Sequence, residues 1–254
     1  MKEDAVQYHI QLKAGDVGRY VLVPGDPGRS EKIAKFFDNP EFISQNREYT
    51  TYTGTLLGEK VSVVSTGIGC PSTAIAIEEL IKIGADTFIR VGTAGGMQPE
   101  TKTGDLAIVT GAIRDEGTSQ QYLPIEFPAI ANVDVVLALR QAAEALDLPF
   151  QLGVAQSKDS FYGETEMDRM PLFKELQARW KAWVAGGAIC SEMESSAIFI
   201  LSSIYRKRAG GVMMMVGEGQ GLPKTPKEKE LFHGDRAIRT AIEAIKILIK
   251  KDQA

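Results

Sequence analysis

Cysteine and histidine are scarce in this chain of 254 residues, which contains two of each. The cysteines, Cys70 and Cys190, form neither a CxxC motif nor a Cys/His pattern with metal-ligand spacing. Their number and spacing therefore argue against a disulfide framework and against a structural zinc site. We expect two reduced thiols in a reducing compartment.

An excess of basic residues and long apolar runs are also absent. The chain has 29 Lys and Arg against 33 Asp and Glu, a formal net charge of −4, so it lacks the basic field that nucleic-acid binding requires. The sequence contains no run of about 18 apolar residues, the length needed to span a membrane. Residues 1–7 are polar and do not resemble the apolar region of a signal peptide. We expect a cytoplasmic protein with no nucleic-acid or membrane partner.

The remaining composition is that of a folded α/β protein. Hydrophobic residues make up 44% of the chain and charged residues 24%, which suits a single domain over 1–254. Short β-branched runs bounded by glycine alternate with helical patterns, which favours a mixed or mostly parallel central sheet. The expected strands are 20–23, 61–65, 88–91, 106–110, 152–155 and 211–216. The expected helices are 28–37, 73–83, 134–146 and 195–207.

A further helix is predicted near the C-terminus. Residues 225–228 fit a capping box with Pro226 at the first helical position. The apolar residues that follow recur at helical spacing and predict a face that covers the sheet. They are Ile238, Ala241, Ile242, Ile245, Leu248 and Ile249.

Two segments at the ends of predicted strands carry arginine. In residues 23–29, Gly25 allows close approach of a ligand to the backbone, and Arg29 lies in the first turn of a helix, where oxyanions bind; a plain turn is the alternative. Arg90 lies inside an apolar strand and is followed by Gly92 and Thr93. A buried arginine needs an anionic or hydrogen-bonding partner, and both a bound phosphate and an internal salt bridge satisfy that need.

Two further loops carry hydroxyls and carboxylates. Ser72 ends a glycine-rich turn, where it either binds a ligand or caps the next helix. Glu192 and Glu194 follow a strand of small residues. They could form paired hydrogen bonds with a diol, or they could be solvated acids that the helix dipole stabilises.

Taken together, these segments resemble the nucleoside phosphorylase family, which includes the uridine phosphorylases and the hexameric purine nucleoside phosphorylases. Within this family, the sequence motifs are most similar to those of the uridine phosphorylases. The resemblance implies an α/β fold around a mixed, barrel-like sheet, and a homo-oligomer with a dimer as its smallest unit, usually within a hexamer. The most specific segments are PGDPGR at 24–29, NREYTTYTG at 46–54, STGIGCPSTAIAIEEL at 65–80, RVGTAGG at 90–96, LPIEFPAIAN at 123–132, SFYG at 160–163 and EMES at 192–195.

The resemblance also implies roles for individual residues. Phosphate is expected on Gly25, Arg29, Arg90, Gly92 and Thr93, with Arg47 reaching in from a neighbouring subunit. Ribose is expected on Thr93, Glu192, Met193 and Glu194, with His9 coming from the neighbour. Phe161 is expected to pack on the base. A monovalent cation such as K+ is expected at Glu48, Ile68 and Ser72, and no organic cofactor is implied.

The base end departs from the family pattern. Uridine phosphorylases place a glutamine and an arginine after the Phe-Tyr pair, whereas residues 161–167 offer Glu164 and Thr165 and supply no arginine. An ionised carboxylate accepts the N3 proton of uracil but donates nothing to the carbonyl oxygens. After the strand at 213–216, Glu218 stands near the position where purine-cleaving members carry an acid; an exposed loop residue is the alternative.

These residues favour a pentosyltransferase that cleaves a nucleoside, uridine before others, with inorganic phosphate. Its catalytic residues would be Arg90, Glu194 and Glu218. A purine or modified-pyrimidine phosphorylase is the first alternative. A nucleosidase, which uses water, is disfavoured by the three arginines at phosphate positions. A non-catalytic nucleoside-binding protein is disfavoured because the phosphate and ribose residues are both present.

Overall fold

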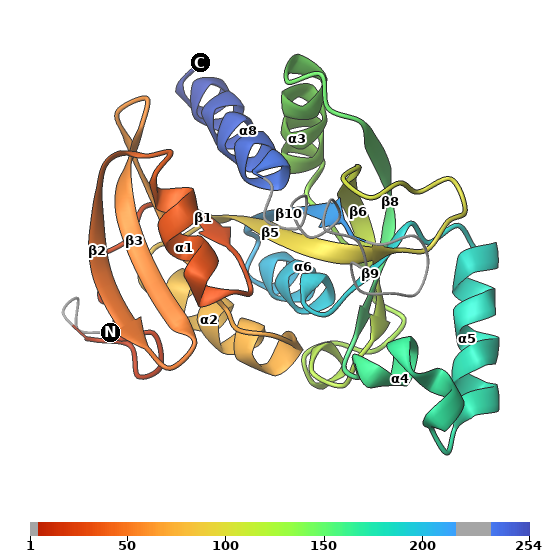
Figure 1. Cartoon of the computed structure of the whole chain (residues 1–254). Helices are drawn as coiled ribbons and strands as arrows, with labels where there is room; N and C mark the ends of the chain where they lie inside the picture. The colour runs from red at the N-terminus through yellow and green to blue at the C-terminus, as the bar shows by residue number, and fades with distance from the viewer. Residues whose placement is uncertain (1–4, 217–234) are drawn as a thin grey trace.

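The computed structural model describes residues 5–216 and 235–254, and it confirms the α/β fold (Figure 1). Within the described residues, a group of strands closes into a mixed barrel. β10 runs parallel to β5 and antiparallel to β6, β8 runs parallel to β6 and β9, and β9 returns antiparallel to β5. The strands are β5 (Thr87–Gly96), β10 (Arg208–Met215), β6 (Leu106–Asp115), β8 (Phe150–Lys158) and β9 (Cys190–Glu192).

The sheet continues beyond the barrel on one side of β5. β1 (Tyr20–Val23) pairs in parallel with β5 and with β4 (Glu59–Val64). β3 (Tyr49–Leu56) and β2 (Asp38–Asn46) then add antiparallel strands, and the short β7 (Ala129–Ile130) pairs with β6. β2 and β3 were not among the expected strands, because β2 is largely exposed and β3 is rich in threonine, so neither is the apolar run that marks a buried strand.

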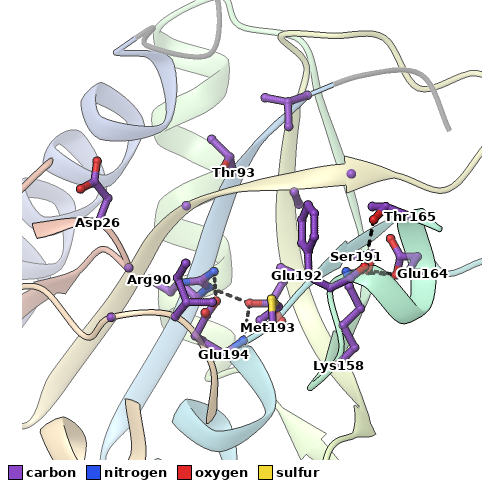
Figure 2. Close-up of a pocket in the computed structure, with 18 of the residues that line it drawn as sticks. Asp26, Arg90, Thr93, Lys158, Glu164, Thr165, Ser191, Glu192, Met193 and Glu194 are labelled. Atoms are coloured by element: carbon purple, nitrogen blue, oxygen red, sulfur yellow. Dashed lines mark hydrogen bonds and ion pairs between the residues drawn. The ribbon is translucent and has the colours of Figure 1, made fainter. Parts of the chain in front are cut away.

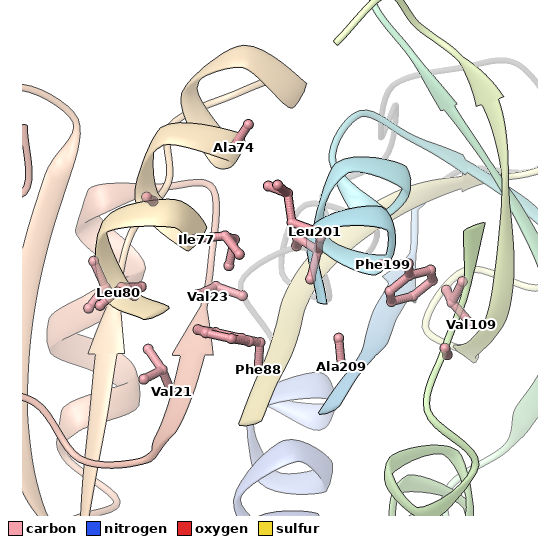
Figure 3. Packing of buried hydrophobic residues seen from close by; sticks show 14 of the residues in the cluster. Val21, Val23, Ala74, Ile77, Leu80, Phe88, Val109, Phe199, Leu201 and Ala209 are labelled. Carbon is pink, nitrogen blue, oxygen red and sulfur yellow. The ribbon is translucent and has the colours of Figure 1, made fainter. Parts of the chain in front are cut away.

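Helices cover both faces of the sheet. On one face, α2 and α6 pack Ile77 and Phe199 against the strands, and Figure 3 shows this layer with Val21 on β1 and Phe88 on β5. On the other face, α1, α3 and α8 contribute a second apolar cluster. The helices are α1 (Pro27–Ala34), α2 (Cys70–Lys82), α3 (Val133–Ala145), α4 (Tyr162–Thr165), α5 (Phe173–Ala185), α6 (Ser195–Ile204) and α8 (Arg236–Gln253).

The predicted C-terminal helix face is confirmed in α8, which lies beside α3 (Figure 1). All six apolar residues predicted to share its covered face are buried. The proposed capping box at 225–228 lies outside the described residues. Among the helices that the structure describes, none combines the length and apolar character needed to cross a bilayer.

Candidate active site

Strands β5 and β9, together with the residues that follow β1, β4, β8 and β9, line a cavity of about 870 Å³, and Val216 at the end of β10 also borders it. This position, at the carboxyl ends of the strands, is where ligands bind in α/β sheets. Figure 2 shows Arg90 with Glu194 in one part of the cavity, whereas Glu164 lies in another. Most residues assigned by resemblance line it: Gly25, Arg29, Ile68, Arg90, Gly92, Thr93, Phe161, Glu164, Thr165, Glu192, Met193 and Glu194.

Two glycines allow the backbone of the cavity wall to pack closely. A Cβ atom on Gly25 would lie 3.1 Å from the carbonyl oxygen of Gly67, so the first loop rests directly on the loop after β4. A Cβ atom on Gly92 would lie 2.7 Å from Met213 Sδ and 3.2 Å from Arg90 Nη2. Larger residues at either position would displace the wall or the Arg90 side chain.

Arg29 enters the cavity as a largely desolvated cation. Asp26 caps α1 by accepting a hydrogen bond from Gly28 N at 2.9 Å, and Arg29 follows in the first turn. The Arg29 guanidinium donates to the carbonyl of Val91 at 3.3 Å and forms no ion pair with any carboxylate in the described residues. Burial lowers its pKa; the charge of Asp26 opposes that effect, and the charge of Arg90 adds to it. An anion in the cavity would relieve this electrostatic cost.

Arg90 is held by two carboxylates, and one of its donors has no partner in the part of the chain that the structure describes. Its Nε lies 2.7 Å from Glu192 Oε2, and its Nη2 forms an ion pair with Glu194. The internal salt bridge that the sequence left open is therefore present. Within residues 5–216 and 235–254, Arg90 Nη1 is buried and has no hydrogen-bond partner. A buried unpaired donor is costly, and Arg90 borders the cavity, so an acceptor bound beside it would lower that cost.

The two glutamates of the EMES segment are both buried, which contradicts the alternative of solvated acids at a helix start. Glu192 accepts hydrogen bonds from Ser157 Oγ and from the backbone N–H groups of Glu194 and Ser195, in addition to Arg90. Both of its oxygens are therefore used in holding α6 and Arg90. A direct contact of Glu192 with ribose stays a prediction that this geometry does not favour.

Glu194 is better placed to contact a ligand. One oxygen accepts a hydrogen bond from Gly69 N at 2.6 Å, the other pairs with Arg90, and the side chain borders the cavity. Burial raises the pKa of Glu194, and the positive charge of Arg90 opposes that effect. A carboxylate fixed by two partners can still accept hydrogen bonds from a diol through its remaining lone pairs.

A cluster in the opposite part of the cavity contains two residues that the sequence analysis missed. Lys158, the last residue of β8, pairs with Glu164 at 3.0 Å and donates to Ser191 Oγ at 2.5 Å. All three side chains are buried and line the cavity. Lysine at the end of a strand is usually exposed to solvent. The one feature of the sequence that could have indicated a buried place for Lys158 in the cavity wall is the pair of polar residues before it, Gln156 and Ser157.

Several assigned residues lie outside the cavity of this chain. His9 is bound by Glu79 through its ring Nδ1 at 2.6 Å and its backbone N–H. Arg47 sits at the β2–β3 turn with a left-handed backbone, φ 53°. Neither borders the cavity, so their expected contribution to a neighbouring subunit stays a prediction. Glu218 lies outside the described residues.

The residues expected to hold a cation are brought together in part. Ser72 Oγ donates to Glu48 Oε1 at 2.7 Å, and this hydrogen bond lowers the pKa of Glu48. Ser72 lies inside α2, whose N-cap is Gly69, so the capping alternative for Ser72 is wrong. Ile68, in the adjoining loop, is 77% exposed at the cavity mouth.

Comparison with known proteins agrees with this geometry. A family model described as "Phosphorylase superfamily" matches residues 19–250. Uridine phosphorylase of Treponema pallidum is 52% identical over 97% of this chain and 95% of its own length. Uridine phosphorylase of Thermococcus kodakarensis is 44% identical over 99% and 90%. Guanosine phosphorylase of Halorubrum lacusprofundi is 36% identical over 96% and 100%. With its α/β barrel, its arginine-lined cavity and these full-length relatives, the chain belongs to the phosphorylase superfamily.

Proposed function

We propose that this protein is a pentosyltransferase that cleaves a nucleoside, uridine before others, with inorganic phosphate to give the free base and ribose 1-phosphate. The observation that carries the proposal is the pair of arginines in the cavity. Among the described residues, Arg29 has no carboxylate partner and Arg90 Nη1 has no hydrogen-bond partner. Two such groups create a site for a multiply charged oxyanion.

The reaction follows from how the substrates would lie in this cavity. Phosphate rests on Arg29, Arg90 and Thr93, and the ribose hydroxyls donate to Glu194. A phosphate oxygen attacks the anomeric carbon, the bond from that carbon to the base nitrogen breaks, and the base leaves with the electron pair and takes up a proton. Fixing phosphate beside the sugar replaces a bimolecular encounter with an oriented one, and its negative charge stabilises the cationic character that develops on the ribose.

A homo-oligomer completes the site in this proposal. His9 and Arg47, which lie away from the cavity of their own chain, would reach the cavity of a two-fold related neighbour in a dimer, with a hexamer as the larger assembly. Glu48, Ile68 and Ser72 would hold a monovalent cation such as K+ near that interface, since a carboxylate and a hydroxyl are suitable oxygen ligands. We place the enzyme in the cytoplasm.

A phosphate-dependence assay tests the proposal. The protein is incubated with uridine in the presence and absence of phosphate, and uracil and ribose 1-phosphate are measured. We expect both products to appear in equal amounts and only with phosphate. Release of uracil at an undiminished rate without phosphate would instead indicate a nucleosidase, and binding of uridine without any cleavage would indicate a nucleoside-binding protein.

A further inference from the structure

The base end of the cavity contains a charged pair that is not part of the arginine cluster. Lys158 ends β8, Ser191 belongs to β9, and Glu164 belongs to the short helix α4. Their exposed fractions are 6%, 3% and 7%, yet each borders the cavity. A buried ion pair contributes little net stability compared with apolar packing. The position of the Lys158–Glu164 pair in the cavity wall therefore points to contact with a ligand.

The hydrogen bonds within the cluster have a definite direction. Lys158 donates to Ser191 at 2.5 Å and pairs with Glu164 Oε2 at 3.0 Å, and Ser191 in turn donates to that same oxygen at 2.6 Å. An ammonium group has three N–H donors, and this arrangement uses two of them. Among the described residues, the side-chain hydrogen bonds of Glu164 involve Oε2 alone. One ammonium donor and Oε1, an acceptor, remain for a ligand.

A donor next to an acceptor is complementary to one kind of base edge. Uracil and thymine present a carbonyl beside the N3–H group, and guanine and hypoxanthine present a carbonyl beside N1–H. Cytosine and adenine present the reverse, an amino group beside a bare ring nitrogen. Against this cluster, an amino base would place its amino group at the ammonium and its ring lone pair at the carboxylate, so both contacts would be repulsive.

We propose that Lys158 and Glu164 determine base specificity by recognising this carbonyl-plus-N–H edge, with Lys158 donating to the carbonyl and Glu164 accepting from the N–H. The inference rests on the proposed function. Lys158, at the end of β8, supplies the donor to the base carbonyl that the segment after Phe161, which has no arginine, does not supply. The enzyme accordingly accepts oxo bases of either ring size that fit the cavity and rejects amino bases.

The experiment compares kcat/KM for uridine, cytidine, inosine and adenosine in the wild type and in two variants. We expect the wild type to prefer uridine over cytidine by about 100-fold or more, because rejection leaves buried polar groups unpaired. Glu164→Gln, which can donate to a ring nitrogen, should reduce that preference by roughly tenfold or more. Lys158→Met should lower kcat/KM for uridine roughly 10- to 100-fold through the loss of a charged hydrogen bond.

The control is an exposed Lys–Glu pair of the same chemistry. Lys35 Nζ and Glu31 Oε1 lie 3.4 Å apart on the surface of α1 and its C-cap. Lys35→Met and Glu31→Gln should leave the base preference unchanged. If Lys158→Met fails to fold, as judged by circular dichroism, the nearly isosteric Glu164→Gln variant still decides the question. An unchanged uridine-to-cytidine ratio in folded Glu164→Gln would overturn the inference.

Calorimetric binding of free bases separates this inference from the proposed function. If the wild type cleaves no nucleoside in phosphate, the proposed function fails. Tighter binding of uracil than of cytosine, lost in Glu164→Gln, would still support recognition of the base edge by this pair. Equal binding of the two bases by the wild type would overturn it.

Discussion

Replacing the two cavity arginines should have opposite effects on the stability of the free protein. Arg29→Met removes a desolvated cation that has no carboxylate partner among the described residues, so the free energy of unfolding without phosphate should stay the same or rise. Arg90→Met leaves the buried carboxylates of Glu192 and Glu194 unpaired. It should lower the free energy of unfolding by about 3–5 kcal/mol.

The phosphate response gives the second half of this prediction. One charge-assisted hydrogen bond contributes about 1.5–3 kcal/mol, so Arg29→Met should weaken phosphate binding roughly 10- to 150-fold. Phosphate at about 100 times the wild-type Kd stabilises the wild type by about 2.7 kcal/mol. At that same concentration, the weakened variant should gain only about 0.3–1.4 kcal/mol.

Urea unfolding with and without phosphate, at one fixed protein concentration, measures both quantities. Arg140→Met is the matched control, since Arg140 forms an exposed pair with Glu144 on α3 and should change stability by less than about 0.5 kcal/mol. A loss of several kcal/mol in phosphate-free Arg29→Met, together with an undiminished phosphate response, would refute the assignment of Arg29 to an anion.

Three further outcomes are expected. Inactive His9→Ala and inactive Glu194→Gln proteins, mixed under conditions of subunit exchange, should recover activity because mixed dimers contain one intact site; no recovery despite proven exchange would count against a shared site. Asp252, whose pKa is lowered to about 2 by its hydrogen bonds with Arg208, stabilises the fold fully above about pH 4 and loses that effect as pH falls toward 2. In Asp252→Asn, the free energy of unfolding should therefore depend less on pH between about 4 and 2 than it does in the wild type. Burial raises the pKa of both cysteine thiols, so an aromatic disulfide reagent should label them only after unfolding.

Local patterns were sufficient to predict the part of the fold that places Arg29 and Arg90 at the cavity. The buried strands β1 and β5 contain short apolar runs with glycine close by, and this pattern is visible within ten residues of sequence. The glycine-containing segments at the ends of these strands pointed to Arg29 and Arg90 as residues of one site, and both line the same cavity. The apolar face of α8 was equally predictable from its 3.6-residue spacing.

The sequence by itself therefore determined the family, the α/β class, and the arginines and glutamates that gather at the strand ends. Only the tertiary structure decided which of these charges are partners. Arg90 and Glu192 are 102 positions apart, and Lys158 and Ser191 are 33 apart; they meet because β9 lies between β8 and β5 in the closed barrel. Hydrogen bonds between buried charges depend on strand order and register, and these are non-local properties that no short stretch of sequence encodes.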